Sequence, residues 1–258
     1  MSGQDEAVAA PPQRVAWQVA RVVEIRPETP RAHTLVLDVP GWRGHRAGQH
    51  VDVRLVADDG YQAQRSYSIA SAPENPRVEL TIERLDDGEV SPYLCDVLHA
   101  GDGLEVRGPI GGYFVWTSAR TGPVFLVAGG SGIVPLMAML RHRAHAEPDV
   151  RARSPMRLLY SARTAQDIIY ARELANLADA GEARVAFTLT REPTSSDWTG
   201  LRRRIDRAMI ETEGWRPDEG VVSYICGPTP FVEAAANLLV ELGHDASRIR
   251  TERFGPTS

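Results

Sequence analysis

The sequence predicts two domains, an antiparallel β-barrel followed by an α/β domain built on a parallel sheet. The chain has 258 residues, which is enough for two domains of ordinary size. Short strand-like segments separated by turn residues fill the first part, a pattern typical of a small barrel. After Thr121, strand-like and helix-like segments alternate, which indicates βαβ units and therefore a parallel sheet.

The strands of the first domain are expected between turn signals such as Pro27, Asp59-Gly60 and Pro76. The expected strands cover residues 17–25, 34–39, 50–56, 63–70, 78–84 and 104–108. One helix is expected over 91–99, with Ser91 as its N-cap and Pro92 at its first helical position. We expect residues 1–14, which are polar and proline-containing, to be a disordered tail, and residues 15–118 to form the barrel domain.

The second domain is expected to cover residues 122–258. Its expected strands are 124–128, 157–161, 185–190, 221–226 and 248–252, and its expected helices are one that ends near His145, then 167–180, 201–210 and 229–242. Ligands of such open parallel sheets bind at the carboxyl ends of the strands. Residues that follow those strands are therefore candidates for a binding site.

Composition excludes several classes of protein. The net charge of −5 gives no general basic field, so nucleic acid is not an expected partner. The apolar run 124–140 is interrupted by glycines and Pro135, which predicts a buried strand and helix rather than a membrane span. With no basic and apolar leader at the start, a cytoplasmic location is the expectation.

Metal and disulfide chemistry are not expected either. The chain has 2 cysteines, Cys95 and Cys226, which cannot supply the four thiolates of a plant-type iron-sulfur cluster. His142 and His145 lie three residues apart on an expected helix, but two ligands do not make a metal site. We expect both histidines to face solvent.

The segment Arg65-Ser66-Tyr67-Ser68 places a cation, an aromatic ring and hydroxyl groups along one expected strand. A flavin nucleotide needs these groups: a guanidinium for its pyrophosphate, a ring against the isoalloxazine and a polar group near N5. An ordinary barrel strand with a polar face would look the same. The pattern Arg-x-Tyr-Ser resembles the signature of the ferredoxin-NADP reductase family, and this resemblance implies that Arg65 holds the flavin phosphates, Tyr67 packs on the flavin and Ser68 bonds its N5.

Three further segments of the first domain match the same family. Gly88-Glu89-Val90-Ser91 opens the expected helix, and a helix start suits a phosphate. The resemblance implies that this segment, through Gly88, Val90 and Ser91, is a second pyrophosphate cradle. It also implies that Thr81, Ile82 and Glu83 line the flavin by their backbone. The turn over 108–114 is similar to that of FAD-binding members, which favours FAD over FMN.

In the second domain, Gly129-Gly130-Ser131-Gly132 joins an expected strand to a helix that contains Pro135 near its start. Glycines let a backbone approach a pyrophosphate closely. The spacing Gly-Gly-x-Gly-x-x-Pro resembles the nicotinamide dinucleotide loop of the family. This loop is expected to bind NAD(P)H.

The last two motifs lie at the ends of expected strands. Cys226-Gly227-Pro228 resembles the family motif beside the nicotinamide, which implies that Cys226 lines the path of hydride transfer. Glu252-Arg253-Phe254 resembles the Glu-x-aromatic ending of plant-type members, in which the aromatic ring shields the flavin. The candidate catalytic residues are Ser68, Cys226 and Glu252, and Phe254 is a candidate flavin contact.

Specificity for the nicotinamide nucleotide depends on charge near its ribose. NADP sites place arginine where NAD sites commonly place an acid. Arg163 follows the second expected strand of this domain, and Thr190-Arg191 stands where NADPH-using family members have a Ser/Thr-Arg pair. The residues favour NADPH, with NADH as the alternative.

The resemblance covers residues from about Val15 to Phe254, with its motifs in family order. It implies an NAD(P)H-dependent flavoprotein that passes electrons through FAD to a separate partner, a ferredoxin or an oxygenase component. One alternative is a reductase of free flavin or another small oxidant. Another is a sensor or electron-transfer subunit that binds FAD without turning over NAD(P)H.

Overall fold

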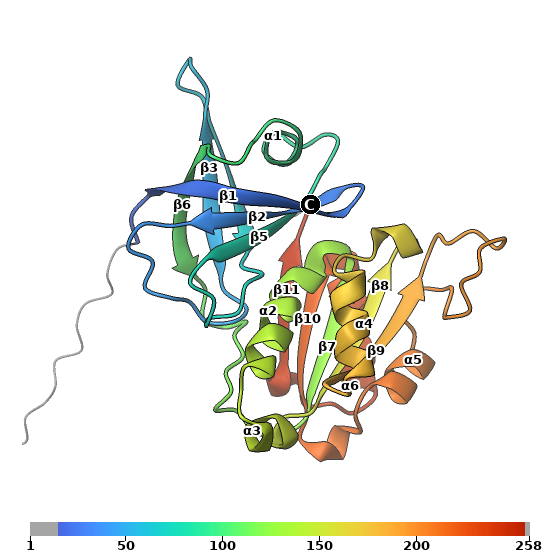
Figure 1. Cartoon of the computed structure of the whole chain (residues 1–258). Coiled ribbons are helices and arrows are strands. Elements are labelled where there is room, and N and C mark those ends of the chain that lie inside the picture. The colour runs from blue at the N-terminus through green and yellow to red at the C-terminus, as the bar shows by residue number, and fades with distance from the viewer. Residues whose placement is uncertain (1–14, 256–258) are drawn as a thin grey trace, which may run out of the picture.

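The computed structural model describes residues 15–255, so the prediction of a tail over residues 1–14 lies outside the described residues. Two bodies lie side by side, with a barrel at the N-terminal end of the chain and a sheet with helices at the other (Figure 1). Within the described range, no helix is long and apolar enough to cross a membrane.

The first body is a six-stranded antiparallel sheet with the order β4-β3-β6-β1-β2-β5. A bridge between Ile69 and Leu80 joins its two edges and closes the barrel. Its strands are β1 (Gln18–Thr29), β2 (Ala32–Asp38), β3 (His50–Val56), β4 (Gln62–Ser68), β5 (Val78–Glu83) and β6 (Gly103–Ile110). Alternate side chains, among them Leu35, Val53 and Leu80, fill the interior. The predicted barrel is confirmed.

Two details of the barrel differ from the sequence prediction. Strand β1 continues past Pro27 because the ladder with β2 is irregular there, and such irregularities tolerate a residue without an N–H. The helix α1 (Ser91–Asp96) is shorter than predicted, and its N-cap is Val90 rather than Ser91. The Ser91 hydroxyl instead accepts a hydrogen bond from the Leu85 N–H at 3.0 Å, which ties the helix start to the end of β5.

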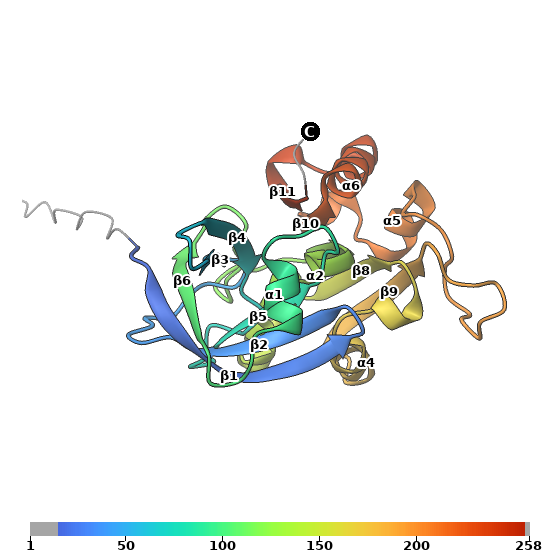
Figure 2. The same ribbon diagram turned by 90° about the horizontal axis from the view of Figure 1, so that it is seen from above.

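The second body is a five-stranded parallel sheet with the order β11-β10-β7-β8-β9. Helices α2 and α4 cover one face, and α5 and α6 cover the other (Figure 2). This arrangement confirms the predicted α/β domain. The strands are β7 (Val124–Gly129), β8 (Met156–Ala162), β9 (Ala183–Leu189), β10 (Val222–Pro228) and β11 (Ile249–Phe254). The α-helices are α2 (Ile133–Ala144), α3 (Pro148–Arg153), α4 (Ala171–Asp179), α5 (Arg207–Glu213) and α6 (Thr229–Glu241). Short 3-10 turns cover Gly130–Gly132, Ala165–Asp167, Pro217–Glu219 and Ala246–Arg248.

Two predicted helices were wrong at their N-terminal ends, and α3 was not predicted. The helix expected from 167 begins only at Ala171, because Thr164 and Asp167 cap a single 3-10 turn and Tyr170 adopts a left-handed conformation, φ 61°. The helix expected from 201 begins at Arg207, because the Asp206 side chain caps it by accepting from the Met209 N–H at 2.9 Å.

An apolar core continues from the barrel into the second domain. Phe114 and Trp116, in the segment between β6 and β7, are buried together with residues of β7 and α2. The Phe114 ring meets the edge of Tyr224, whose hydroxyl donates to the Val115 carbonyl at 2.8 Å. A shared core of this kind holds the two domains together.

Candidate functional site

A row of polar side chains crosses from the barrel to the parallel sheet. Ser68 and His50 are direct partners in the β3–β4 ladder, and Cys226 and Glu252 are direct partners in the β10–β11 ladder. His50 Nδ1 lies 3.8 Å from Glu252 Oε1, which joins the two pairs. The structure thus links the three sequence candidates for catalysis, Ser68, Cys226 and Glu252, through a residue that the sequence did not identify.

A local signal could have found His50. The five-residue loop 57–61 is centred on Asp59, and equal steps outward from Asp59 place residue 50 opposite residue 68. Because Ser68 was already a candidate, its cross-strand partner was a candidate too.

Burial tunes the protonation of this row. Burial raises the pKa of Glu252 to about 7, and its Oε2 is buried without a hydrogen-bond partner in the described part of the chain. Burial also lowers the pKa of His50. The pKa of Cys226 is raised well above its ordinary value, first by burial and then by the Glu252 carboxylate. The row therefore offers a neutral imidazole, a thiol rather than a thiolate, and a carboxyl group that gains or loses a proton near neutral pH.

Replacing Glu252 with glutamine is expected to change how stability depends on pH. The folded pKa of about 7 exceeds the ordinary value of 4.5, so Glu252 destabilises the fold increasingly as pH rises from about 4.5 to 7. The full offset corresponds to roughly 3 kcal/mol. We expect Glu252→Gln to gain stability relative to the wild type across this window, measured by urea unfolding at several pH values.

The exposed Glu233, on α6, provides the matched control as Glu233→Gln. For Glu233→Gln, the plot of unfolding free energy against pH should remain parallel to that of the wild type. If Glu252→Gln also remains parallel at all pH values, the assignment of a raised pKa to Glu252 is wrong.

The glycine loop lies against the end of β10. A Cβ atom on Gly132 would stand 2.1 Å from the Cys226 carbonyl oxygen, and one on Gly129 would stand 2.8 Å from the Phe231 ring. Gly130 has φ +55°, a conformation that favours glycine. Gly130, Ser131 and Gly132 form a 3-10 turn, and Pro135 lies in the first turn of α2. Only glycine at these positions lets the loop pack so closely against Cys226-Gly227-Pro228.

On the barrel side, Arg65 and the start of α1 are brought together. The Arg65 guanidinium donates to Glu89 Oε2 at 2.8 Å, and both side chains are about half exposed. Glu89 belongs to the segment Gly88–Ser91, in which a Cβ on Gly88 would stand 2.8 Å from Ser91 Oγ. Tyr67 packs half-buried on the barrel core. A single anionic group could therefore meet both Arg65 and the N–H groups of this tight segment.

Strand β5 offers backbone rather than side chains. Ile82 is fully buried in the barrel core, and the Thr81 hydroxyl is bonded to Thr34 Oγ1 at 2.7 Å and to the Tyr170 hydroxyl. The Glu83 carboxylate lies next to the glycine loop, 3.8 Å from where a Cβ on Gly130 would stand. Because the Thr81 and Ile82 side chains are engaged in this way, these two residues offer a ligand only their main chain.

Arg163, Thr190 and Arg191 lie side by side at the carboxyl ends of β8 and β9. The Arg191 N–H donates to the Arg163 carbonyl at 2.8 Å, and the Thr190 N–H donates to the Ala162 carbonyl at 3.0 Å. Both guanidinium groups are exposed and, within residues 15–255, neither has a hydrogen bond or an ion pair. Two unpaired cations on neighbouring strand ends suit a phosphate.

Two other residues are placed differently from the prediction. Arg202 falls within the helix expected over 201–210 but lies in a loop, where its guanidinium donates to the carbonyls of Pro193 and Trp198, both at 2.6 Å. His142 does not face solvent, because its Nδ1 lies 2.7 Å from Glu74 Oε1 and its ring packs on Trp116. Phe254 ends β11 opposite Pro228 and is 37% exposed. In the described part of the chain, no group of three or more His, Cys, Asp or Glu could hold a metal ion.

The donor set fits a flavin nucleotide and a nicotinamide nucleotide at the junction of the domains. The barrel supplies Arg65 and a tight helix start, and the sheet supplies a loop whose close approach requires glycine. The polar row that begins at Ser68 and ends at Cys226 connects the two. These features define a two-domain dinucleotide-binding oxidoreductase.

Comparison with known proteins gives the family. Residues 21–115 match the oxidoreductase FAD-binding domain, and residues 126–237 match the oxidoreductase NAD-binding domain. Ferredoxin-NADP reductase B of Sorangium cellulosum is 32% identical over 91% of this chain and 96% of its own length. The chain belongs to the ferredoxin-NADP reductase family of FAD- and NAD-binding oxidoreductases.

Other relatives and solved structures agree with this family. The glycine betaine monooxygenase reductase subunit of Pseudomonas aeruginosa is 35% identical over 93% of this chain, and the chain spans 64% of the length of that relative. The flavohaem-like FAD/NAD-binding domain of nitric oxide dioxygenase from Vibrio cholerae is 25% identical with a TM-score of 0.79, covering 93% of this chain and 99% of that one. A cytochrome P450 reductase of Amycolatopsis is 27% identical with a TM-score of 0.78, covering 95% and 71%.

Proposed function

We propose that the protein is an FAD-dependent NAD(P)H oxidoreductase that passes electrons from NADPH through FAD to a separate redox partner. The observation that carries the proposal is the polar row Ser68–His50–Glu252–Cys226. In this row, His50 of the barrel lies 3.8 Å from Glu252 of the parallel sheet. A flavin ring held beside Ser68 and a nicotinamide ring held beside Cys226 would be close enough to touch, and contact between the rings is the main requirement for hydride transfer.

The residues divide the work between two domains, 15–118 for FAD and 122–258 for the nicotinamide nucleotide. Arg65 and the segment Gly88–Ser91 would hold the flavin pyrophosphate, Tyr67 and Phe254 would pack on the ring, and Thr81–Glu83 would line it. Bound FAD would supply the conversion of a two-electron donor into a source of single electrons. Gly129–Gly132 and Pro135 would hold the nicotinamide nucleotide, and Gly227 and Pro228 would let its ring approach Cys226.

The polar row would serve this reaction by placing protons rather than by attacking the substrate. Burial raises the pKa of Cys226, which disfavours the thiolate, so the side chain acts as a small wall beside the nicotinamide. Glu252 can hold or release a proton near neutral pH, and His50 lies 3.8 Å from its carboxylate and opposite Ser68 in the β3–β4 ladder. A proton at the Ser68 hydroxyl would then be within reach of the reactive edge of the flavin.

The partner class is proposed from the relatives. Several relatives are named as reductase components of oxygenase systems, among them the 3-ketosteroid-9-alpha-monooxygenase ferredoxin reductase component of Rhodococcus rhodochrous, 30% identical over 95% of this chain. Another relative is named as a ferredoxin-NADP reductase. A separate ferredoxin or oxygenase component is therefore the proposed acceptor.

An acceptor comparison tests the proposed function. The FAD-loaded protein is supplied with NADPH, and the acceptors are a plant-type ferredoxin, an oxygenase component and free FMN in separate reactions. Reduction of a protein acceptor well above that of free FMN is the expected result. Faster reduction of free FMN than of every protein acceptor would favour the small-acceptor reductase instead.

Replacing Arg191 with alanine is expected to weaken the binding of NADPH far more than the binding of NADH. The unpaired Arg191 guanidinium stands beside Arg163 at the strand ends, and a hydrogen bond to a charged group contributes about 1.5–3 kcal/mol, or roughly 10- to 150-fold in affinity. The Michaelis constants for both nucleotides measure the effect. Arg153→Ala, at the end of α3 and so at the amino ends of β7 and β8, is the control, and equal losses for NADPH and NADH in Arg191→Ala would defeat the NADPH assignment.

A further inference from the structure

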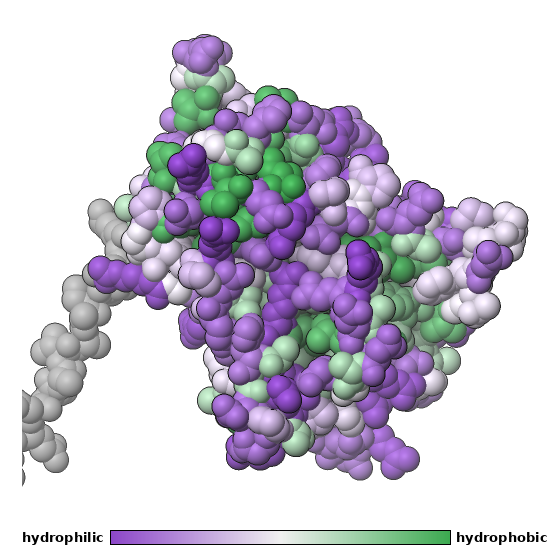
Figure 3. Space-filling view, in the orientation of Figure 1, coloured by the Kyte–Doolittle hydropathy of each residue, from purple (hydrophilic) through white to green (hydrophobic). Residues whose placement is uncertain are grey.

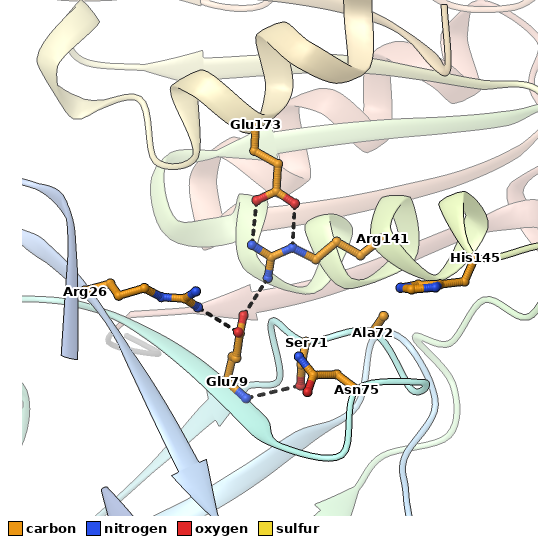
Figure 4. Close-up of a pocket in the computed structure, with 8 residues that line it drawn as sticks. All are labelled: Arg26, Ser71, Ala72, Asn75, Glu79, Arg141, His145 and Glu173. Carbon is orange, nitrogen blue, oxygen red and sulfur yellow. Dashed lines mark hydrogen bonds and ion pairs between the residues drawn. The ribbon is translucent and has the colours of Figure 1, made fainter. Parts of the chain in front are cut away.

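A polar network crosses the junction between the domains beside the site, and Arg141 is its centre (Figure 4). Arg141 lies in the last turn of α2 and is 17% exposed. Its guanidinium donates to Glu173 of α4 through two bonds, at 2.8 and 2.6 Å. It also donates to the Ala70 carbonyl at 2.9 Å and to Glu79 Oε2 at 3.0 Å, both on the barrel. One side chain therefore binds both domains.

The barrel partner Glu79 is itself held from two sides. Arg26 of β1 donates to Glu79 Oε1 at 2.6 Å, and the Ser71 hydroxyl accepts from the Glu79 N–H at 3.1 Å. The chain Arg26–Glu79–Arg141–Glu173 alternates in charge, so each inner group has an opposite charge on both sides. Hydrophilic residues line the junction on the face in Figure 3, whereas hydrophobic residues gather over the barrel.

A second contact reinforces the same corner. Tyr170 precedes α4 in a left-handed conformation, φ 61°, that is unfavourable for a tyrosine. Its buried ring lies under the Arg141 guanidinium at 4.9 Å, and its hydroxyl bonds to Thr81 of β5. The backbone conformation directs the tyrosine across the junction, where it touches the strand proposed to line the flavin.

The network joins the two elements whose spacing matters for the proposed reaction. Glu79 and Thr81 lie on β5, and the backbone of β5 is proposed to line the flavin. Arg141 lies on α2, which begins immediately after the glycine loop proposed to hold the nicotinamide nucleotide. Arg141 is eight positions after Ile133, about 12 Å along a rigid helix. A displacement at Arg141 is therefore transmitted to the loop.

We propose that Arg141 is a positioning residue that sets the distance between the glycine loop Gly129–Gly132 and strand β5 by holding α2 to Glu79 and Ala70. This inference rests on the proposed function. Arg141 contacts neither nucleotide; it acts through α2 and β5. The shared apolar core holds the domains together, and the directional bonds of Arg141 fix their alignment.

Arg141→Met tests this inference because methionine keeps much of the side-chain volume and removes every bond. In the FAD-loaded variant, the rate of flavin bleaching at saturating NADPH should fall about 10- to 100-fold, since misplacement by about 1 Å can slow a reaction 100-fold. FAD content and NADP⁺ affinity should change little. The charge-transfer absorbance of the reduced protein with NADP⁺ bound should weaken, which reports ring contact without turnover.

Two further variants separate alignment from stability. Arg141→Lys should recover part of the rate, because an ammonium can keep one contact but cannot bridge both domains as the guanidinium does. Arg143→Met is the matched control: Arg143 is on the same helix turn and buried, and among residues 15–255 it bonds to Ser154, Glu182 and Arg151, all in the second domain. It should lower the melting temperature and leave the bleaching rate and the charge-transfer absorbance unchanged.

The bleaching rates of the variants test the role of Arg141, and the bleaching of the wild type tests the proposed function. If the wild type is bleached by NADPH and Arg141→Met is bleached at the same rate, Arg141 is not a positioning residue. An equal loss of rate in Arg143→Met would also overturn the inference. Should Arg141→Met fail to fold, Glu79→Gln removes the charge on the barrel side, and a normal rate in that variant would sink the proposal. A wild type that is never bleached defeats the proposed function itself.

Discussion

Replacing Gly132 with alanine is expected to reduce NADPH-dependent bleaching of the flavin about 100-fold, a loss in line with roughly 1 Å of misplacement. The added Cβ would stand 2.1 Å from the Cys226 carbonyl oxygen, and a main-chain atom cannot move aside as a flexible side chain can. The glycine loop must then shift away from β10, and the nicotinamide would shift with it. FAD content should be unaffected, because the barrel holds the flavin. Stopped-flow absorbance and FAD extraction measure the two quantities.

Gly103→Ala supplies the comparison for this variant. Gly103 begins β6 on the barrel, and an added Cβ would meet only a side-chain carbon of the exposed Val19, at 3.0 Å. This variant should be bleached at the rate of the wild type. Normal bleaching of Gly132→Ala would show that the loop does not position the nicotinamide.

Replacing Arg65 with alanine is expected to weaken FAD binding by about 10- to 100-fold, the usual contribution of charge-assisted hydrogen bonds. Arg65 is held at the Gly88–Ser91 segment by its bond to Glu89. The Arg65–Glu89 pair is exposed, so its loss should affect the folding stability little. Titration of the FAD-free protein with FAD, followed by quenching of flavin fluorescence, gives the dissociation constant.

Glu89→Gln provides a test in the opposite direction. In the structure the Arg65 guanidinium donates a hydrogen bond to the Glu89 carboxylate, which therefore competes with a flavin phosphate for Arg65. Removing its charge should free Arg65 and reduce repulsion of the phosphate, so FAD should bind more tightly. Equal FAD affinity in the wild type, Arg65→Ala and Glu89→Gln would show that the pyrophosphate lies elsewhere.

The strands of both domains could be predicted because each carries a local pattern. Alternating burial in the barrel and short apolar runs in the parallel sheet are properties of a few neighbouring residues. The motifs around Arg65, Gly129 and Cys226 are equally local. Their meeting at one junction followed from the resemblance, not from the residues alone.

Helix starts were harder to predict because side-chain bonds decide them. A periodic pattern suggested helix from 167, but Tyr170 takes a left-handed conformation that no periodicity reveals. Asp206 caps α5 with its own side chain, so the preceding arginines lie in a loop rather than on a helix. In both cases one residue outweighed the preference of its neighbours.

Long-range polar contacts could not be predicted. Arg141 and Glu79 are 62 residues apart, and Thr81 and Tyr170 are 89 residues apart. The sequence around one residue of either pair gives no indication of its partner, because each pair forms only when the two domains pack together. His50 is an intermediate case: its pairing with Ser68 follows from the hairpin turn, whereas its approach to Glu252 requires the whole fold.

Anaerobic stopped-flow mixing of the FAD-loaded protein with NADPH shows whether the two rings meet. We propose that the polar row brings a flavin held by the barrel against a nicotinamide held by the glycine loop. We expect the visible flavin absorbance to be bleached in a single mixing event without any other protein. If the protein binds FAD fully and keeps its colour with excess NADPH and with excess NADH, the polar row does not bring the two rings together.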